Sequence, residues 1–188
     1  MKETINDDDI LALLTQQTSY EQGFRLLMVK YREPLYAHIR RMVGSHDDAD
    51  DVLQNTFIKV FKSITRFEKK SKLFTWLYRI ATNEAITFLT GRNKKETDTI
   101  DDPENLAVIN QLRSDEDIDG EGIERKLEAA LKTLPEKQLA VFNLRYYEEM
   151  PYEEMSKILD TSVGALKASY HHAAKKIEAF LKGENIPT

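Results

Sequence analysis

The sequence contains no cysteine, which excludes disulfide bonds and thiolate metal ligands. Only 7 glycines and 5 prolines occur among 188 residues, and strand-like alternation is rare, so we predict an all-α protein. No apolar run approaches the roughly 20 residues that a membrane-spanning helix needs. The N-terminal segment is acidic, whereas a signal peptide begins with basic residues. We therefore expect a cytoplasmic protein without membrane insertion.

The net charge of -5 is distributed in blocks along the chain. Residues 24–95 hold 15 Lys and Arg against 7 Asp and Glu, a net charge of +8. Residues 96–124 hold 1 against 11, a net charge of -10, and residues 125–182 return to +2. Screening over about 8–10 Å makes the local charge the one that a phosphate senses. Although the summed charge argues against it, the block pattern favours nucleic-acid binding by the basic regions.

The same pattern predicts two small helical domains joined by a flexible acidic linker. We expect the domains at residues 1–95 and 123–188, with the linker at residues 96–122. Periodicity is lost in the linker, apart from one short helical patch near residues 106–112. Helices are expected at residues 9–14 and 24–43 of the first domain, the second of them kinked or split at Pro34.

Two further helices of the first domain have outer faces of different chemistry. At about 100° per residue, a core stripe in residues 45–64 comprises Ala49, Val52, Leu53, Thr56, Phe57, Val60, Phe61 and Ile64. The opposite face is rich in acids and amides: Asp51, Gln54, Asn55, Ile58 and Lys62. In residues 73–88 the core stripe comprises Leu73, Leu77, Ile80, Ala81, Ala85 and Phe88. The outer face of that helix carries Thr75, Arg79, Thr82, Asn83 and Ile86, with Lys72 and Trp76 at its edge.

The second domain is predicted to end in a helix-turn-helix. Its helices are expected at residues 122–134, 135–146, 151–159 and 163–182. A short turn at residues 160–162 joins the last two. The outer face of the last helix carries Gly164, Ala168, His171, His172 and Lys175, with Lys167 at its side. Small residues near the N-terminus let such a helix approach base edges, while polar residues behind them contact bases and phosphates.

These segments resemble one family of proteins. The stretch HDDADDVLQNTFIKVFKSITRF, followed by FTWLYRIATNEAITFL, is similar to two elements of the extracytoplasmic-function sigma factors. These are small promoter-recognition subunits of bacterial RNA polymerase. The stretch LPEKQLAVFNLRYYEEMPYEEMSKILDTSVGALKASYHHAAKKIE is similar to their C-terminal DNA-binding domain. The resemblance covers both predicted domains in the family's order.

The resemblance implies a sigma subunit with no catalytic activity, no cofactor and no metal site. Its implied partners are core RNA polymerase, promoter DNA and, as is usual in the family, an anti-sigma factor. With their outward neighbours, the implied polymerase-binding residues are Asp48, Asp51, Gln54, Asn55 and Ile58. The residues implied for the minus-ten element are Lys72, Thr75, Trp76, Arg79 and Asn83. Those implied for the minus-thirty-five element are Lys167, Ala168, Ser169, His171, His172 and Lys175. The loop from Ser63 to Lys72 matches the one that captures a flipped base.

The chain departs from the family at several of these positions. The family often carries Arg where this chain has Ser169 and His172, and fewer guanidinium groups remove the commonest guanine contact. We therefore expect weaker or differently coded upstream recognition. Phe57 faces the predicted core, and Trp76 has an alternative interpretation as a partly buried core residue. Two other functions stay open: a free-standing helix-turn-helix regulator, and a helical module for protein contacts.

Overall fold

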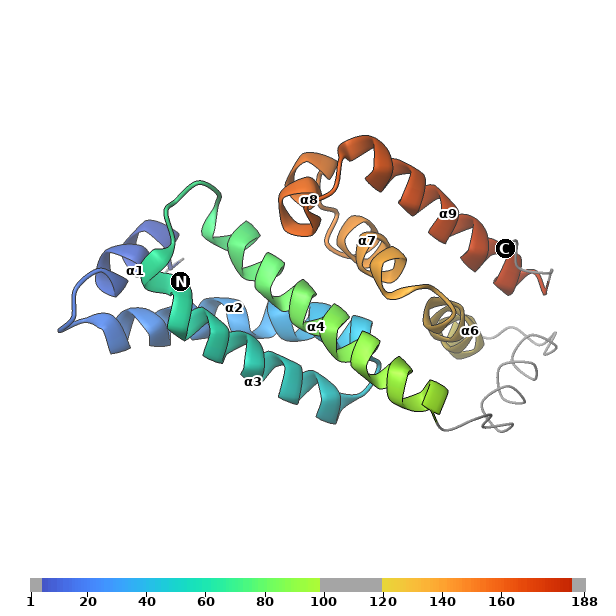
Figure 1. The fold of residues 1–188 in the computed structure, drawn as a ribbon, viewed down its shortest axis with the longest axis horizontal. Coiled ribbons are helices and arrows are strands. Elements are labelled where there is room, and N and C mark those ends of the chain that lie inside the picture. The colour runs from blue at the N-terminus through green and yellow to red at the C-terminus, as the bar shows by residue number, and fades with distance from the viewer. Residues whose placement is uncertain (1–4, 99–119, 184–188) are drawn as a thin grey trace. The chain divides into compact units, whose positions relative to one another are not determined.

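The computed structural model describes residues 5–98 and 120–183. In these ranges it contains α-helices and a short 3-10 helix but no strand, which confirms the all-α prediction (Figure 1). The helices form two compact units, the first holding α1 to α3 and α4 as far as Phe88, and the second built mainly from α6 to α9. The predicted helical patch of the linker, residues 106–112, lies outside the described residues, and the domain boundaries stay predictions.

The described residues of the first unit form four α-helices, the last of them α4 as far as Phe88, and one short 3-10 helix. They are α1 (Asp7–Leu14), α2 (Tyr20–Val43), α3 (His46–Ser63), η1 (Ile64–Arg66) and α4 (Leu73–Asp98). Pro34 lies inside α2, which is continuous, so of the two predicted alternatives, a kink or a split, the split does not occur. A proline removes one hydrogen bond of the helix, and the buried residues Tyr31 and Leu35 hold the turns on both sides against the core. None of the described helices combines the length and the apolar character that a bilayer crossing requires.

Two neighbouring residues, Gly44 and Ser45, set the junction between α2 and α3. Gly44 ends α2 with a φ of 87°, a left-handed conformation that glycine adopts at little cost. The Ser45 hydroxyl then accepts a hydrogen bond of 3.1 Å from the backbone N–H of Asp48. This tight connection fixes where the acidic first turn of α3 begins.

The buried surface of α4 includes polar residues beside its apolar stripe. Leu73, Leu77, Ala81 and Ala85 are buried as predicted. The prediction that Thr75 and Thr82 face outward is wrong, because they are only 2% and 0% exposed. The hydroxyl oxygen of Thr82 lies 2.9 Å from Nε2 of His38, which α2 places at the same level of the core. Thr82 therefore belongs to the core through its contact with His38, although the apolar stripe alone placed it on the outer face.

Four helices between residues 120 and 183 have ends within two residues of the predicted ones. They are α6 (Gly120–Lys132), α7 (Glu136–Tyr146), α8 (Tyr152–Leu159) and α9 (Val163–Leu181). The predicted turn between α8 and α9 is confirmed, and Asp160 begins it in a left-handed conformation with φ 50°. The Ser162 hydroxyl caps α9 by accepting a 3.3 Å hydrogen bond from the N–H of Ala165. α9 packs against α6 and α7 and leaves its opposite face exposed.

Candidate functional site

The outer face of α3 carries the acid and amide residues that the sequence placed there. Asp51, Gln54, Asn55 and Lys62 are exposed, and Ile58 is 44% exposed among them. Asp48, in the first turn, is half-buried. The predicted orientation of this face is therefore confirmed, and its members lie on one regular helix at fixed spacing.

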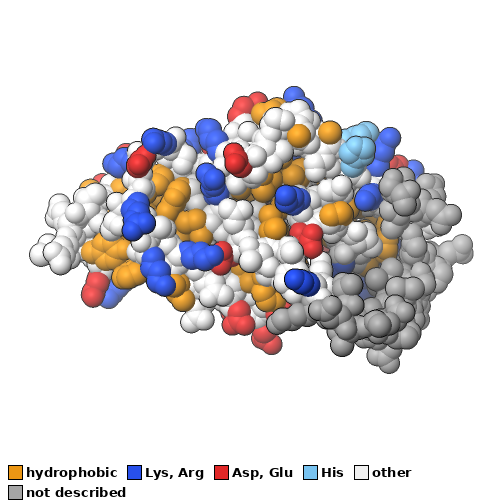
Figure 2. All heavy atoms as spheres, viewed as in Figure 1, with side chains coloured by type: hydrophobic (Ala, Val, Ile, Leu, Met, Phe, Trp, Pro, Cys, Tyr) orange, Lys and Arg blue, Asp and Glu red, His pale blue; other side chains and the backbone are white. Residues whose placement is uncertain are grey.

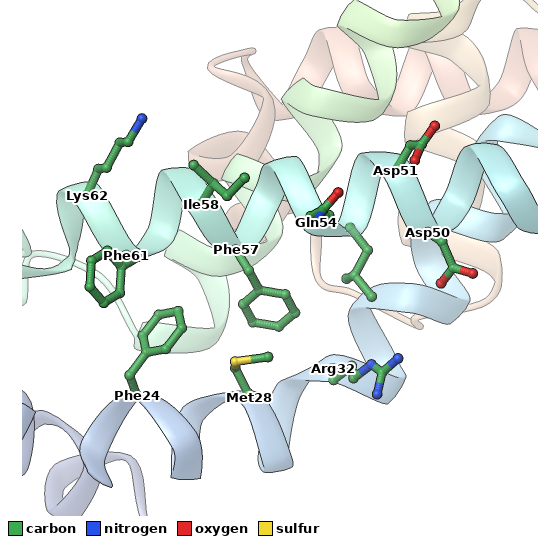
Figure 3. A pocket seen from close by; sticks show the side chains of 11 residues that line it. Phe24, Met28, Arg32, Asp50, Asp51, Gln54, Phe57, Ile58, Phe61 and Lys62 are labelled. Atoms are coloured by element: carbon green, nitrogen blue, oxygen red, sulfur yellow. The ribbon is translucent and has the colours of Figure 1, made fainter. Parts of the chain in front are cut away.

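A groove of about 560 Å³ runs beside this face, between α3 and α2. In Figure 3 Phe24 and Met28 of α2 point toward Phe57 and Phe61 of α3 across it. The Phe24 ring meets the Phe57 and Phe61 rings edge to face, at centroid distances of 6.3 and 5.1 Å. Such packing is favourable for aromatic pairs. The walls of the groove are therefore apolar and well ordered by ring contacts.

Charged residues surround the groove along its length. The rim carries Asp50 and Asp51 near one end, Lys62 near the other, and Arg32 on the α2 side. An apolar floor with a charged rim is the composition of a protein-binding patch, in which burial supplies affinity and the rim supplies orientation.

Phe61 is the one member of the predicted α3 core stripe that is exposed. It is 49% exposed, so its assignment to the core is wrong. Its ring lies 5.3 Å from that of Tyr20, whose hydroxyl donates a 2.8 Å hydrogen bond to the Phe61 carbonyl oxygen. The residue packs sideways against α2 at the end of the groove instead of inward against α4.

The outer face of α4 carries a smaller set of promoter candidates than predicted. Lys72, Arg79 and Asn83 are exposed, and Trp76 is half-buried. Thr75 is buried and packs inside the unit, so it does not belong to this surface. An ion pair between Glu84 of α4 and Lys59 of α3 joins the two helices beside the face. The positions of Arg79 and Asn83 on a packed helix hold both side chains on the same outward side.

The loop before α4 carries a pair of aromatic rings. The Phe67 and Trp76 rings lie 5.3 Å apart with an angle of 49° between their planes, and both residues are half-buried. Lys69 has a φ of 54°, a conformation that costs a residue with a Cβ more than it costs glycine. The interpretation of Trp76 as partly buried is confirmed, and its contact partner belongs to the loop predicted to hold a flipped base.

A buried histidine lies behind the α4 face. His38 is fully buried, and its ring centroid is 5.2 Å from that of Tyr78. Burial, with a smaller contribution from the nearby charge of Arg41, lowers the pKa of His38 to about 3. The imidazole is therefore neutral at neutral pH, and it bonds to Thr82, the residue next to Asn83.

The outer face of α9 carries small residues near its N-terminus, followed by histidines and lysines. Ala168, Lys167, His171, His172 and Lys175 are exposed, whereas Ser169 is half-buried. A Cβ added at Gly164 would meet no atom within 4 Å, so open space lies beside the first turn. Figure 2 shows a histidine surface in pale blue with Lys and Arg side chains nearby.

Sequence reasoning missed contributions from outside the predicted faces. Phe24, Met28 and Arg32 come from α2 and complete the groove. Their spacing of four residues on one helix is a signal, but this periodicity fits an ordinary core stripe equally well. In the second unit, Tyr146 is 54% exposed and stacks on Phe142 at a centroid distance of 5.1 Å.

The comparisons with known proteins agree on one family. The family described as Sigma-70 region 2 matches residues 27–95, and Sigma-70 region 4 matches residues 124–177. The ECF RNA polymerase sigma-E factor of Haemophilus influenzae is 32% identical over 185 residues, covering 95% of this chain and 96% of that protein. The RNA polymerase sigma-H factor of Pseudomonas aeruginosa is 29% identical, covering 88% of this chain and 90% of that one.

Solved structures share the fold at lower identity. CnrH in complex with the cytosolic domain of CnrY is similar with a TM-score of 0.66 at 19% identity, over 95% of this chain and 99% of that one. The sigma factor RpoE in complex with the anti-sigma factor NepR from Bartonella quintana gives a TM-score of 0.64 at 21% identity, over 86% and 98%. With both sigma regions in order and a relative matched along nearly its whole length, the chain belongs to the extracytoplasmic-function sigma factors of the sigma-70 family.

Proposed function

We propose that this sigma factor divides the contacts of transcription initiation among the exposed faces of α3, α4 and α9. As a member of its family, the chain directs promoter recognition by RNA polymerase through regions 2 and 4 and has no catalytic activity of its own. The observation that supports the division is the difference in side chains between the three faces. The α3 face is acidic with an apolar groove, while the α4 and α9 faces carry cations, amides and imidazoles.

Core polymerase binds α3 in this proposal. Asp51, Gln54, Asn55 and Ile58 form the contact surface, and Asp48 adds charge at the start of the helix. The groove beside them accepts an apolar side chain of the polymerase, because burial there removes Phe61 and Ile58 from water. The acids orient a basic segment of the partner.

Promoter DNA binds the other two faces. Arg79, Asn83 and Lys72 contact the minus-ten element, and Trp76 with Phe67 offers rings on which an unpaired base can stack. On α9, Lys167, His171, His172 and Lys175 contact the minus-thirty-five element, with Ala168 at the point of closest approach and Ser169 at its edge. Thr75 acts only in packing.

Three assignments complete the proposal. The working domains are residues 1–95 and 123–188, with residues 96–122 as the connector between two DNA contacts. The chain acts in the cytoplasm, where its polymerase partner is. The two similar solved structures are complexes with CnrY and with the anti-sigma factor NepR, and we infer that this chain too has a protein that sequesters it.

Transcription with purified components tests the proposal. Core polymerase and the full chain are supplied with templates whose upstream region is random, and run-off transcripts are sequenced. We expect transcripts that depend on both proteins and that share two separated sequence elements. Binding of the chain to a duplex without polymerase, with no promoter-dependent transcript, would instead identify a free-standing regulator that uses only its helix-turn-helix.

A further inference from the structure

The chain has four histidines, which lie in different surroundings. His38 is sealed in the core of the first unit and bonded to Thr82. His46, at the start of α3, has Nδ1 2.6 Å from the hydroxyl oxygen of Tyr36. His171 and His172 are both exposed on α9, with ring centroids 6.1 Å apart. Two adjacent imidazoles therefore occupy the surface that we assign to the upstream element.

The surface around this pair is open and positively charged. Lys167 and Lys175 are exposed on the same side of α9. Gly164 and Ala168, one to two turns before the pair, leave room for a close approach of the helix to a duplex. At that approach, side chains at positions 171 and 172 are within reach of phosphates as well as base edges.

In the part of the chain that the structure describes, the elements packed around α9 place no carboxylate against the pair. Among the residues that the structure describes, α6 and α7 pack on α9, and neither brings a carboxylate into ion-pair range of His171 or His172. α8 contributes the Tyr152 ring, which has Lys167 of α9 at 5.7 Å and Arg145 of α7 at 5.2 Å from its centroid. On α9 itself, Glu178 is ion-paired with Lys182. Within the described residues, neither imidazole therefore has a carboxylate in ion-pair range, and a bound phosphate can neutralise a proton on either ring.

We propose that His171 and His172 take up protons when α9 docks on promoter DNA, so that upstream recognition strengthens as the pH falls. The inference rests on the proposed function, because it requires α9 to face the duplex. Histidine changes its charge between about pH 5 and pH 8, and a neighbouring phosphate favours the charged form. Arginine, which the family often carries at one of these positions, is charged throughout this range. A histidine at this place makes a proton-linked contact, whereas an arginine would make a constant one.

The test uses holoenzyme made with the full chain, either wild type or the double variant His171→Gln with His172→Gln. The probe is a labelled promoter recovered from the random upstream pool, together with the same promoter truncated so that it lacks the upstream element. The ratio of the two affinities isolates the α9 contact, because the polymerase, His38 and His46 contribute to both probes alike. A second double variant, His171→Arg with His172→Arg, serves as the permanently charged control.

We expect the wild-type ratio to rise roughly fivefold to thirtyfold between about pH 8 and about pH 6, as two charge contacts form. The slope of log affinity against log salt should steepen by about one to two at the lower pH. The affinity ratio of the Gln variant should change by less than about twofold over this pH range. The affinity ratio of the Arg variant should be high at both pH values. An equal pH response in wild type and Gln variant overturns proton uptake but leaves the proposed function intact. A wild-type ratio of one at both pH values overturns both.

Discussion

The α3 and α9 helices are almost equal in length, at 18 and 19 residues, yet we assign them different kinds of partner. Each begins with a serine whose hydroxyl caps its first turn. α3 exposes Ile58 and Phe61 beside acids, whereas the middle of α9 exposes small residues, imidazoles and lysines. The two helices therefore have the same backbone structure and the same type of N-terminal cap. The side chains therefore decide how each face gains binding free energy: by burial of apolar surface on α3, or by neutralisation of phosphate charge on α9.

The largest expected difference between the two units is the loss of unfolding free energy at acidic pH. The buried His38 has a pKa near 3, whereas a histidine in an unfolded chain titrates near 6.5. Below that value the unfolded state binds a proton that the folded unit excludes. The stability of the first unit should therefore fall by about 1.4 kcal/mol per pH unit as the pH drops from about 6.5 toward 3. Urea unfolding followed by fluorescence of Trp76, the single tryptophan of the chain, measures this unit.

The control for this prediction is His38→Gln, which has no titrating group and can still bond to Thr82. We expect a lower stability at neutral pH because the shape of the core changes, but a shallower decline in acid. If the variant and the wild type lose stability with the same slope, then carboxylates and not His38 govern the acid response.

The apolar groove should account for the next largest effect. Phe61→Ala removes an exposed ring that borders the groove, and we expect core polymerase affinity to fall by more than about 2 kcal/mol, roughly thirtyfold. The matched control is Val29→Ala, since Val29 is 67% exposed on α2 but does not line the groove. Fluorescence titration of core enzyme measures both. Equal affinities for the two variants would remove the groove from the polymerase contact.

The α4 face should affect selectivity and not polymerase affinity. Asn83→Ala removes an amide that is exposed on α4. We expect about 1 to 2 kcal/mol less discrimination between a matched and an altered minus-ten element, because an amide hydrogen bond to one base is lost. Transcription from both templates, with core affinity measured in parallel, tests this. Asn83 has no role in recognition if the variant discriminates as well as the wild type.

The smallest effect should be the same in both helices. Ser45→Ala and Ser162→Ala each remove one capping hydrogen bond, and we expect each to cost about 1 kcal/mol of unfolding free energy. Hydrogen exchange resolved along the chain should place each loss in its own unit. A loss shared by both units after one substitution would show that they unfold together.

Features that depend on nearby residues were predictable from the sequence. Gly44 ends one helix and Ser45 caps the next, as these residue types favour, and the turn before α9 lies at the predicted residues. The outward position of Asp51, Gln54 and Ile58 followed from helical periodicity alone. These features depend on backbone geometry and on hydrogen bonds that span only a few residues.

Tertiary packing decided the rest. Thr82 is buried because α2 brings His38 against α4, and Thr75 is buried on the same helix. Phe61 stayed exposed because it packs sideways on Phe24 and Tyr20. A helical stripe shows which side is apolar, but it does not show how wide a neighbouring helix makes the buried surface. The sequence alone therefore determined the helices, their caps and the family. The groove and the polar core exist only where segments distant in the chain meet.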